Sequence, residues 1–270
     1  MTKANILSIQ LRPKIGQKQK NLEKASELIE KNLSKVANSP DLILLPEFFN
    51  TGISVPEFKK LAETPQKNET VDFFAKIAQK HNTYILCGSI IETDGKNLYN
   101  TSTLIDRKGK IVAKYRKIHL FDSFGGTEDQ YCTRGDKEIV VDTDFGKIGM
   151  SVCFDIRFPK HFLNLVKQGA QIIVEPAAWC APNQYFQINK EQWQLMNKAR
   201  ALDNMVYFCS SNLCGKVDSF LSACGSSMIC APNGEVLAQA DEDEGAIGAC
   251  IDTGFLDMLR SQFNMPKLTE

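Results

Sequence analysis

The chain has 270 residues, 43% of them hydrophobic and 24% charged, and Lys plus Arg equal Asp plus Glu at 32 each. This length and apolar content allow a large hydrophobic core and exclude a disordered or fibrous protein. The balanced charge argues against a nucleic-acid-binding surface, and no apolar run is long enough to cross a membrane.

The amino terminus and the cysteines predict a cytoplasmic protein. The first ten residues contain no long apolar segment of the kind found in secretory signals. The nine cysteines are odd in number and form no Cys-x-x-Cys pair, which favours reduced thiols over disulfides or a zinc site. We therefore expect no metal, and we expect most of these thiols to fill the core.

The first half of the chain alternates strand-like and helix-like segments. Ala4–Gln10 predicts a strand, and the apolar spacing from Leu22 to Val36 predicts an amphipathic helix. A strand, a helix, a strand and a two-stranded hairpin with a turn at 106–109 are predicted next, at Asp41–Leu45, Val71–Lys80, Thr83–Ile91, Thr101–Ile105 and Ile111–Tyr115.

The second half repeats this alternation. The predicted segments are a strand at Lys147–Cys153, a helix at Pro159–Gln168, a strand at Gln171–Glu175, a helix at Asn189–Asp203, a strand at Val206–Ser211, a hairpin of Ser227–Cys230 and Val236–Ala240 with its turn at Pro232–Gly234, and a strand at Gly245–Ile251.

This order of elements predicts a fold class. No linker or low-complexity stretch interrupts the chain, so residues 1–270 are expected to form one domain. Hairpins within a βα alternation exclude a purely parallel sheet. They predict an α/β fold in which two mixed β-sheets pack face to face with helices outside.

One cysteine lies where a predicted strand meets a predicted helix. The largely apolar Lys147–Val152 precedes Cys153, and Pro159 marks the start of the helix. The sulfur is therefore expected at the edge of the sheet, near helical N–H groups that favour a thiolate. Such a thiol suits nucleophilic catalysis, whereas the alternative is a buried cysteine that acts as a small hydrophobe.

Two further polar residues follow predicted apolar strands. Glu47 comes after a strand and a proline, which hold its carboxyl group rigidly enough to act as a general base. Lys117 follows another strand, where its ammonium group is able to stabilise an oxyanion. Each residue alone also fits an ordinary surface charge. Together with Cys153, however, they supply the base, the oxyanion stabiliser and the nucleophile that acyl transfer requires.

Three segments of the chain carry a family resemblance. They are Leu45-Pro-Glu47, Arg116-Lys117-Ile-His119-Leu and Gly149-Met-Ser-Val-Cys153-Phe-Asp-Ile-Arg-Phe-Pro159. In this order they resemble the signature segments of the nitrilase superfamily of carbon–nitrogen hydrolases, and the similarity extends over nearly the whole chain.

The resemblance implies a four-layer αββα sandwich and a catalytic triad of Glu47, Lys117 and Cys153. It also implies a second glutamate that positions the substrate or the deacylating water, and Glu128 is the best match. Members of this family dimerise through their sandwiches, so a homodimer or a higher homo-oligomer is expected.

The activity implied is that of a cysteine-dependent amidase. Such an enzyme hydrolyses a small linear amide to a carboxylate and ammonia through a thioester, and it needs no cofactor. The resemblance further implies that Lys117 and the N–H group of Phe154 hold the oxyanion. The segment from Cys153 to Pro159 is most similar to the Nit-type branch, which includes the ω-amidases.

The residues of the substrate pocket are less well specified. Glu175 is predicted near the pocket rim, and Trp179 and Phe49 are predicted as pocket walls. Three other functions remain open: hydrolysis of N-carbamoyl amines, a catalytically silent scaffold of the same fold, and a redox-sensing thiol protein in which Cys180 or Cys132 resolves Cys153.

Overall fold

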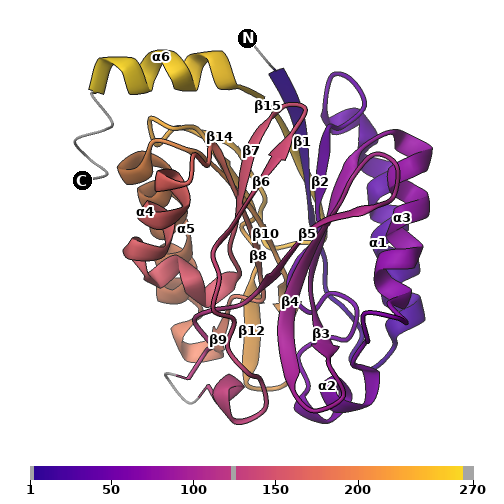
Figure 1. Cartoon of the computed structure of the whole chain (residues 1–270). Helices are drawn as coiled ribbons and strands as arrows, with labels where there is room; N and C mark the ends of the chain where they lie inside the picture. Colours follow the sequence, from indigo (N-terminus) through magenta and orange to yellow (C-terminus); the bar gives the residue numbers. More distant parts are fainter. Residues whose placement is uncertain (1–2, 123–125, 264–270) are drawn as a thin grey trace.

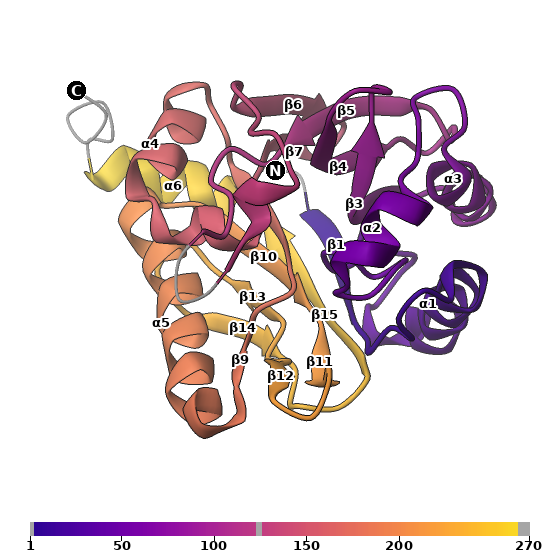
Figure 2. The ribbon, with the colours of Figure 1, turned by 90° about the horizontal axis from the view of Figure 1, so that it is seen from below.

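The computed structural model describes residues 3–122 and 126–263. Two six-stranded mixed sheets lie in the middle, with α1 and α3 outside one sheet and α4 and α5 outside the other (Figures 1 and 2). The predicted α/β architecture of two mixed sheets covered by helices is thus confirmed. No helix in the described ranges is both long and apolar enough to cross a membrane.

The first sheet is built mainly from the first half of the chain. Its strands, in spatial order, are β15 (Gly245–Asp252), β1 (Lys3–Gln10), β2 (Leu42–Leu44), β3 (Tyr84–Thr93), β4 (Leu98–Ile105) and β5 (Ile111–Arg116). The β1–β2 and β2–β3 pairs are parallel and the other pairs are antiparallel. Its helices are α1 (Lys18–Asn32), α2 (Val55–Leu61) and α3 (Glu69–His81).

The second sheet comes from the second half. Its strands, in spatial order, are β14 (Val236–Gln239), β13 (Met228–Cys230), β10 (Tyr207–Asn212), β8 (Ile172–Ala177), β7 (Gly146–Met150) and β6 (Ile139–Thr143). A third sheet joins β11 (Cys214–Lys216), β12 (Leu221–Cys224) and β9 (Cys180–Pro182). The helices here are α4 (Pro159–Lys167), α5 (Phe186–Asn204) and α6 (Thr253–Phe263).

The two large sheets are buried on both faces. One apolar cluster fills the space between them and continues under α4 and α5, while a second cluster lies between the first sheet and its own helices. Hydrogen bonds also cross between the sheets, from Ser8 Oγ to Ser210 O at 2.7 Å and from Ser211 Oγ to Ile9 O at 2.5 Å. These contacts fix how the ends of the two sheets face one another.

The last strand of the chain returns to the first sheet. β15 pairs along its whole length with β1, from Lys3 opposite Asp252 to Gln10 opposite Gly245. This pairing closes the first sheet with a strand from the other half of the sequence.

Several predicted boundaries differ from the structure. α1 ends at Asn32 and a short 3₁₀ turn, Leu33–Lys35, replaces its expected last turn. β7 ends at Met150, so Cys153 lies beyond the strand rather than in it. Six elements have no counterpart among the predicted segments, namely α2, β6, β9, β11, β12 and α6.

Candidate active site

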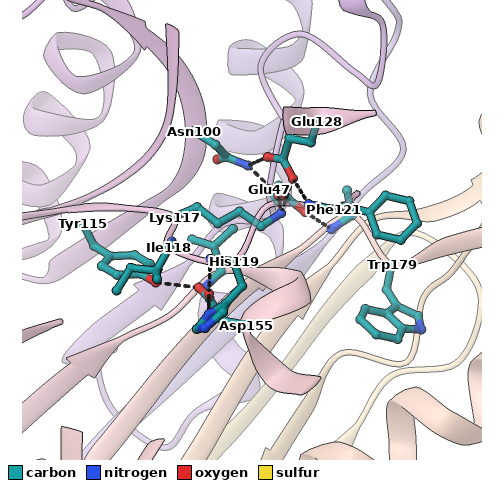
Figure 3. Close-up of polar contacts among 12 residues, drawn as sticks. Glu47, Asn100, Tyr115, Lys117, Ile118, His119, Phe121, Glu128, Asp155 and Trp179 are labelled. Carbon is teal, nitrogen blue, oxygen red and sulfur yellow. Dashed lines mark hydrogen bonds and ion pairs between the residues drawn. The ribbon is translucent and has the colours of Figure 1, made fainter. Parts of the chain in front are cut away.

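The four predicted catalytic residues follow separate elements at one edge of the paired sheets. Glu47 follows β2, Lys117 follows β5, Cys153 follows β7, and Glu128 begins a 3₁₀ turn at Glu128–Gln130. The structure brings the two glutamates together on the lysine (Figure 3). Glu47 and Lys117 both act on the pKa of the Cys153 thiol.

The centre of the cluster is a buried ammonium group between two carboxylates. Lys117 Nζ lies 3.0 Å from Glu47 Oε1 and 2.9 Å from Glu128 Oε2. All three side chains are buried. Burial disfavours the lysine charge, but the carboxylates of Glu128 and Glu47 outweigh burial and raise the pKa of Lys117 well above its usual value. Lys117 is therefore a permanent cation at the floor of the site.

A tight backbone contact fixes Glu47. Gly88 on β3 has a φ of +50°, and a Cβ atom there would lie only 1.9 Å from Pro46 O, so only glycine allows this approach. Phe48 adopts a φ of +53°, and its N–H donates to Ser89 O at 2.8 Å. The N–H of Ala178 then donates to Glu47 Oε2 at 2.8 Å. Glu47, which follows a strand of the first sheet, is thus held by a backbone N–H group that follows a strand of the second sheet.

A second close approach sets Glu128 beside Lys117. The N–H of Gly135 donates to Lys117 O at 2.9 Å, and a Cβ atom on Gly135 would lie 2.0 Å from Arg116 O. The N–H of Phe121 donates to Glu128 Oε2 at 2.8 Å. The segment that carries Glu128 is therefore held against the end of β5 by backbone contacts.

Cys153 occupies a strained turn at the start of the 3₁₀ segment Cys153–Arg157. Its φ is +51°, a left-handed conformation that costs a residue with a side chain about 1–3 kcal/mol. Strain of this kind is typical of a nucleophile that a sharp strand-to-helix turn presents to a substrate.

The environment of the Cys153 thiol favours its protonated form. Cys153 is 8% exposed. Burial, together with the neighbouring Glu47 carboxylate, raises the pKa of the Cys153 thiol well above its usual value, and Lys117 opposes this only in part. Desolvation therefore outweighs the N–H groups and the lysine that were expected to favour the thiolate. Cys153 consequently needs a base to accept its proton.

Asp155 links the turn of Cys153 to the end of β5. Its carboxylate accepts hydrogen bonds from Val152 N at 2.9 Å, Tyr115 Oη at 2.7 Å and His119 N at 3.0 Å (Figure 3). His119 Nδ1 also lies 2.7 Å from Asp155 Oδ1. Although burial opposes ionisation, these contacts, above all the one with His119, lower the pKa of Asp155. Asp155 therefore holds the turn of Cys153 against the segment that carries Lys117 through hydrogen bonds.

The predicted pocket residues occupy different environments. Phe154 directly follows the nucleophile, and its ring packs edge-on against Phe121 at 5.2 Å. Trp179 packs at 5.3 Å from Trp193, near the cluster. Phe49, by contrast, is fully buried and packs against Phe74 on α3. The prediction that Phe49 forms a pocket wall is not supported, because its ring belongs to the core beneath the first sheet.

Glu175 is also deeper than its predicted place at the pocket rim. Its side chain on β8 is fully buried, and Oε2 is hydrogen-bonded to the Ser151 hydroxyl. Oε1 has no hydrogen-bond partner within the described ranges. Burial, with the Asp155 charge adding to it, raises the pKa of Glu175 well above its usual value. Burial of Glu175 therefore favours the neutral form of its carboxyl group.

We predict that Glu175→Gln stabilises the protein at pH 7.5. The raised pKa means that the folded state keeps a proton that the unfolded chain releases, so stability is lost as pH rises from the usual glutamate value through the folded one. Glutamine does not ionise and avoids this loss, which is worth roughly 1 kcal/mol or about 3 °C in Tm. Thermal unfolding of both proteins at pH 4.5 and 7.5 measures the difference.

Glu138→Gln is the matched control for this measurement. The pKa of Glu138 is lowered, chiefly by its hydrogen bond from Asn164, so its loss is expected to destabilise the protein at pH 7.5. The quantity to compare is the Tm of Glu175→Gln minus the Tm of wild type at each pH. A difference that is lower at pH 7.5 than at pH 4.5 would show that the buried carboxyl group is ionised.

The sequence did not single out Asn100 or Arg157. Asn100 lies within β4, and its side chain donates to both Glu47 and Glu128. The Arg157 guanidinium lies 5.0 Å from the Trp179 ring centroid and donates to Gln192 Oε1 at 3.0 Å. The sequence feature that pointed to Arg157 was its position four residues after Cys153.

The described residues include all nine cysteines, and each is a free thiol. Cys132 and Cys180 lie close enough to the cluster for Glu47 and Lys117 to affect their titration, but burial raises the pKa of each to about 12. Within the same ranges, no group of three or more His, Cys, Asp or Glu side chains is arranged to hold a metal ion.

Comparison with known proteins assigns the family. The carbon–nitrogen hydrolase family model matches residues 6–260. The chain is 30% identical to omega-amidase NIT3 of Saccharomyces cerevisiae over 98% of this chain and 92% of that protein. It is 33% identical to omega-amidase NIT2 of Xenopus tropicalis over 91% of this chain and 87% of that protein.

The fold agrees with this assignment. The crystal structure of S. cerevisiae Nit3, a member of branch 10 of the nitrilase superfamily, superposes with a TM-score of 0.86 at 29% identity, covering 97% of this chain and 94% of the other. A carbon–nitrogen hydrolase from Helicobacter pylori shares the fold with a TM-score of 0.89 at 24% identity, covering 98% of this chain and 94% of the other. The resemblance inferred from the three sequence segments is confirmed, and the chain belongs to the carbon–nitrogen hydrolase family of the nitrilase superfamily.

Proposed function

We propose that this protein is a cysteine-dependent amidase that hydrolyses small linear amides to a carboxylate and ammonia. The observation that carries the proposal is the buried Lys117 ammonium between Glu47 and Glu128, beside the strained turn of Cys153. This arrangement supplies a nucleophile, a base and a fixed positive charge without a histidine.

The acylation step begins with proton transfer. Glu47 takes the proton of the neutral Cys153 thiol, and the resulting thiolate attacks the amide carbonyl carbon. Lys117 and the N–H group of Phe154 stabilise the tetrahedral oxyanion, and one such donor is typically worth about 3 kcal/mol. Glu47 then gives its proton to the leaving nitrogen, so that ammonia departs and a thioester remains on Cys153.

The deacylation step reverses these roles. A water molecule, positioned by Glu128 and deprotonated by Glu47, attacks the thioester carbonyl carbon. The carbon–sulfur bond breaks, the carboxylic acid leaves, and Cys153 recovers its proton from Glu47. Both glutamates contact the same ammonium group, which supports a shared role in the two steps.

An ammonia-release screen tests this function. The substrates are simple aliphatic amides, ω-amides of dicarboxylic acids and N-carbamoyl amines, and ammonia is measured over time. The proposal predicts release from linear amides. Release from N-carbamoyl compounds alone would favour the alternative amidohydrolase, and no release from any compound would favour the silent scaffold.

Arg157 supports ω-amides of dicarboxylic acids as the substrate class. It is the fourth residue after the nucleophile, and its guanidinium lies 6.0 Å from the ring centroid of Phe154, the residue that follows Cys153. Gln192 and the ring of Trp179 hold it in place. A planar guanidinium pairs well with a carboxylate, which an ω-amide carries at its far end. The relatives named omega-amidases agree with this substrate class.

We therefore expect Arg157→Gln to discriminate against acidic substrates. Loss of one charged hydrogen bond is expected to raise KM for a dicarboxylate ω-amide about 30-fold, the equivalent of about 2 kcal/mol. An uncharged amide of the same chain length is the control, and its KM should be nearly unchanged. An equal rise in KM for both substrates would show that Arg157 does not recognise the carboxylate.

We also infer that the protein forms a homodimer through α5. Three apolar side chains seven residues apart, Ile188, Leu195 and Leu202, are each more than half exposed. Residues at this spacing lie along one face of a helix, and an exposed apolar stripe of this kind suits self-association about a twofold axis.

Leu195→Glu is expected to convert the dimer to a monomer, because it places a charge at the centre of this stripe. Light scattering after size-exclusion chromatography measures the mass. Ile15→Glu, which introduces the same charge at an exposed apolar residue before α1, is the control and should leave the mass unchanged. A Leu195→Glu protein with the wild-type mass would exclude α5 as the interface.

The free thiols support a reducing compartment such as the cytoplasm. Eight of the nine cysteines are buried or partly buried, whereas Cys250 is exposed. Unpaired thiols in such number are typical of proteins that fold under reducing conditions.

A further inference from the structure

Asn100 contacts every charged member of the catalytic cluster. Its side-chain Nδ2 donates to Glu47 Oε1 at 2.7 Å and to Glu128 Oε1 at 2.8 Å (Figure 3). Its backbone carbonyl oxygen accepts a hydrogen bond from Lys117 N at 2.9 Å. One residue within β4 therefore holds the base, the second glutamate and the lysine in a fixed relation.

The chemistry of an amide suits this position. Two carboxylates share a single ammonium group, so the cluster has a surplus negative charge that repels itself. The two N–H bonds of an amide stabilise both carboxylates without adding a charge that would compete with Lys117. An aspartate of the same shape would add a third negative charge instead.

The orientation of Asn100 leaves one of its polar atoms without a hydrogen-bond partner among the described residues. A carboxylate only accepts hydrogen bonds, so the amide nitrogen must face the glutamates. Oδ1 is then directed elsewhere, and within the described ranges it has no hydrogen-bond partner although the side chain is buried. A buried acceptor without a partner is unfavourable. Asn197 Oδ1 also lacks a partner within the described ranges, so this cost is matched in the control residue used below.

The contacts also distinguish the two oxygens of Glu47. Oε1 accepts from both Asn100 and Lys117, which uses its two lone pairs. Oε2 accepts from Ala178 N, which leaves one lone pair on this oxygen when contacts within the described ranges are counted. The oxygen able to accept a further proton is therefore Oε2.

We propose that Asn100 is a positioning residue that occupies Glu47 Oε1 and so directs the Cys153 proton to Glu47 Oε2, while it holds Glu128 in place for the deacylating water. The proposal rests on the proposed amidase function. Asn100 touches neither the thiol nor the substrate in this scheme, and it acts through the two glutamates.

The test compares Asn100→Leu with wild type and with Asn197→Leu. Asn197 is another fully buried asparagine, but it bonds to Trp193 O in its own helix α5. Acylated Cys153 is counted by mass spectrometry, so that rates refer to folded active sites. The kcat, the KM and the pH profile of kcat/KM are then measured for each protein on the best amide found for wild type.

Asn100→Leu is expected to lower kcat per acylated site about 100-fold with little change in KM, because a misplaced base slows proton transfer without weakening binding. Asn197→Leu should lower only the thermal stability and the number of active sites.

Asn100→Asp keeps the shape of the side chain and provides a second variant if the leucine protein does not fold. It should be inactive near neutral pH and should recover activity, relative to wild type, as pH falls and the added carboxyl group gains a proton. A kcat per site within about three-fold of wild type in either variant would overturn the proposal. Amide hydrolysis by wild type in the same experiment would leave the proposed function intact.

Discussion

Cys153→Ala is expected to abolish amide hydrolysis and to leave the fold intact. The turn at Cys153 is set by backbone contacts and by Asp155, so alanine should adopt the same conformation. Without a nucleophile, the glutamates and the lysine have no thioester to form or hydrolyse. We expect a loss in kcat of roughly 10⁵-fold or more and a change in Tm of only a few degrees.

Ammonia release and thermal unfolding measure these two effects. Cys250→Ala is the matched control, because Cys250 is an exposed thiol on β15 and should be dispensable. A Cys153→Ala protein that retains wild-type activity would contradict the thioester mechanism, whereas loss of activity in Cys250→Ala would contradict the assignment of the nucleophile.

Lys117→Met should damage both activity and stability. The substitution leaves Glu47 and Glu128 as buried carboxylates without the cation they share at 3.0 and 2.9 Å. Breaking a buried ion pair in this way typically costs about 3–5 kcal/mol. The oxyanion also loses its charged partner, so kcat is expected to fall about 1000-fold or more.

A double variant separates these two effects. Adding Glu128→Gln to Lys117→Met removes one of the uncompensated charges and should recover part of the stability, measured by urea unfolding, but none of the activity. A Lys117→Met protein of wild-type stability would show that the buried triad does not depend on the lysine charge.

The positions of Glu47, Lys117 and Cys153 were predictable because each lies at or just beyond the end of a predicted strand. Such residues fall at the edge of a sheet whatever the details of the fold. Their assembly depended on two sheets from different halves of the chain packing face to face, which the three ordered segments indicated only through a family resemblance. The structure supplies the distances that the pattern lacked.

Asn100 was not predictable from the same reasoning. It lies inside β4 among Thr101, Ser102 and Thr103, a polar run that is buried only because the first sheet is covered on both faces. Nothing in the local sequence distinguishes the asparagine from its neighbours, and its partners Glu47 and Glu128 come from distant segments.

The errors in the predicted pocket have related causes. Phe49 lies in the turn after Glu47 and packs in the core between the first sheet and α3, while Glu175 is fully buried against Ser151. Proximity in sequence to a catalytic residue therefore does not decide which side chains line a cavity. The small sheet of β9, β11 and β12 was missed because strands of three or four residues form through tertiary pairing more than local preference.

Rapid acid quench of the wild-type protein during turnover of a linear amide, followed by peptide mapping, tests the central claim most directly. The account predicts an acyl group, equal in mass to the substrate less ammonia, on the peptide that contains Cys153, and no such adduct in Cys153→Ala. Ammonia release by wild type with no acyl group on Cys153, or with the acyl group on another residue, would contradict the account.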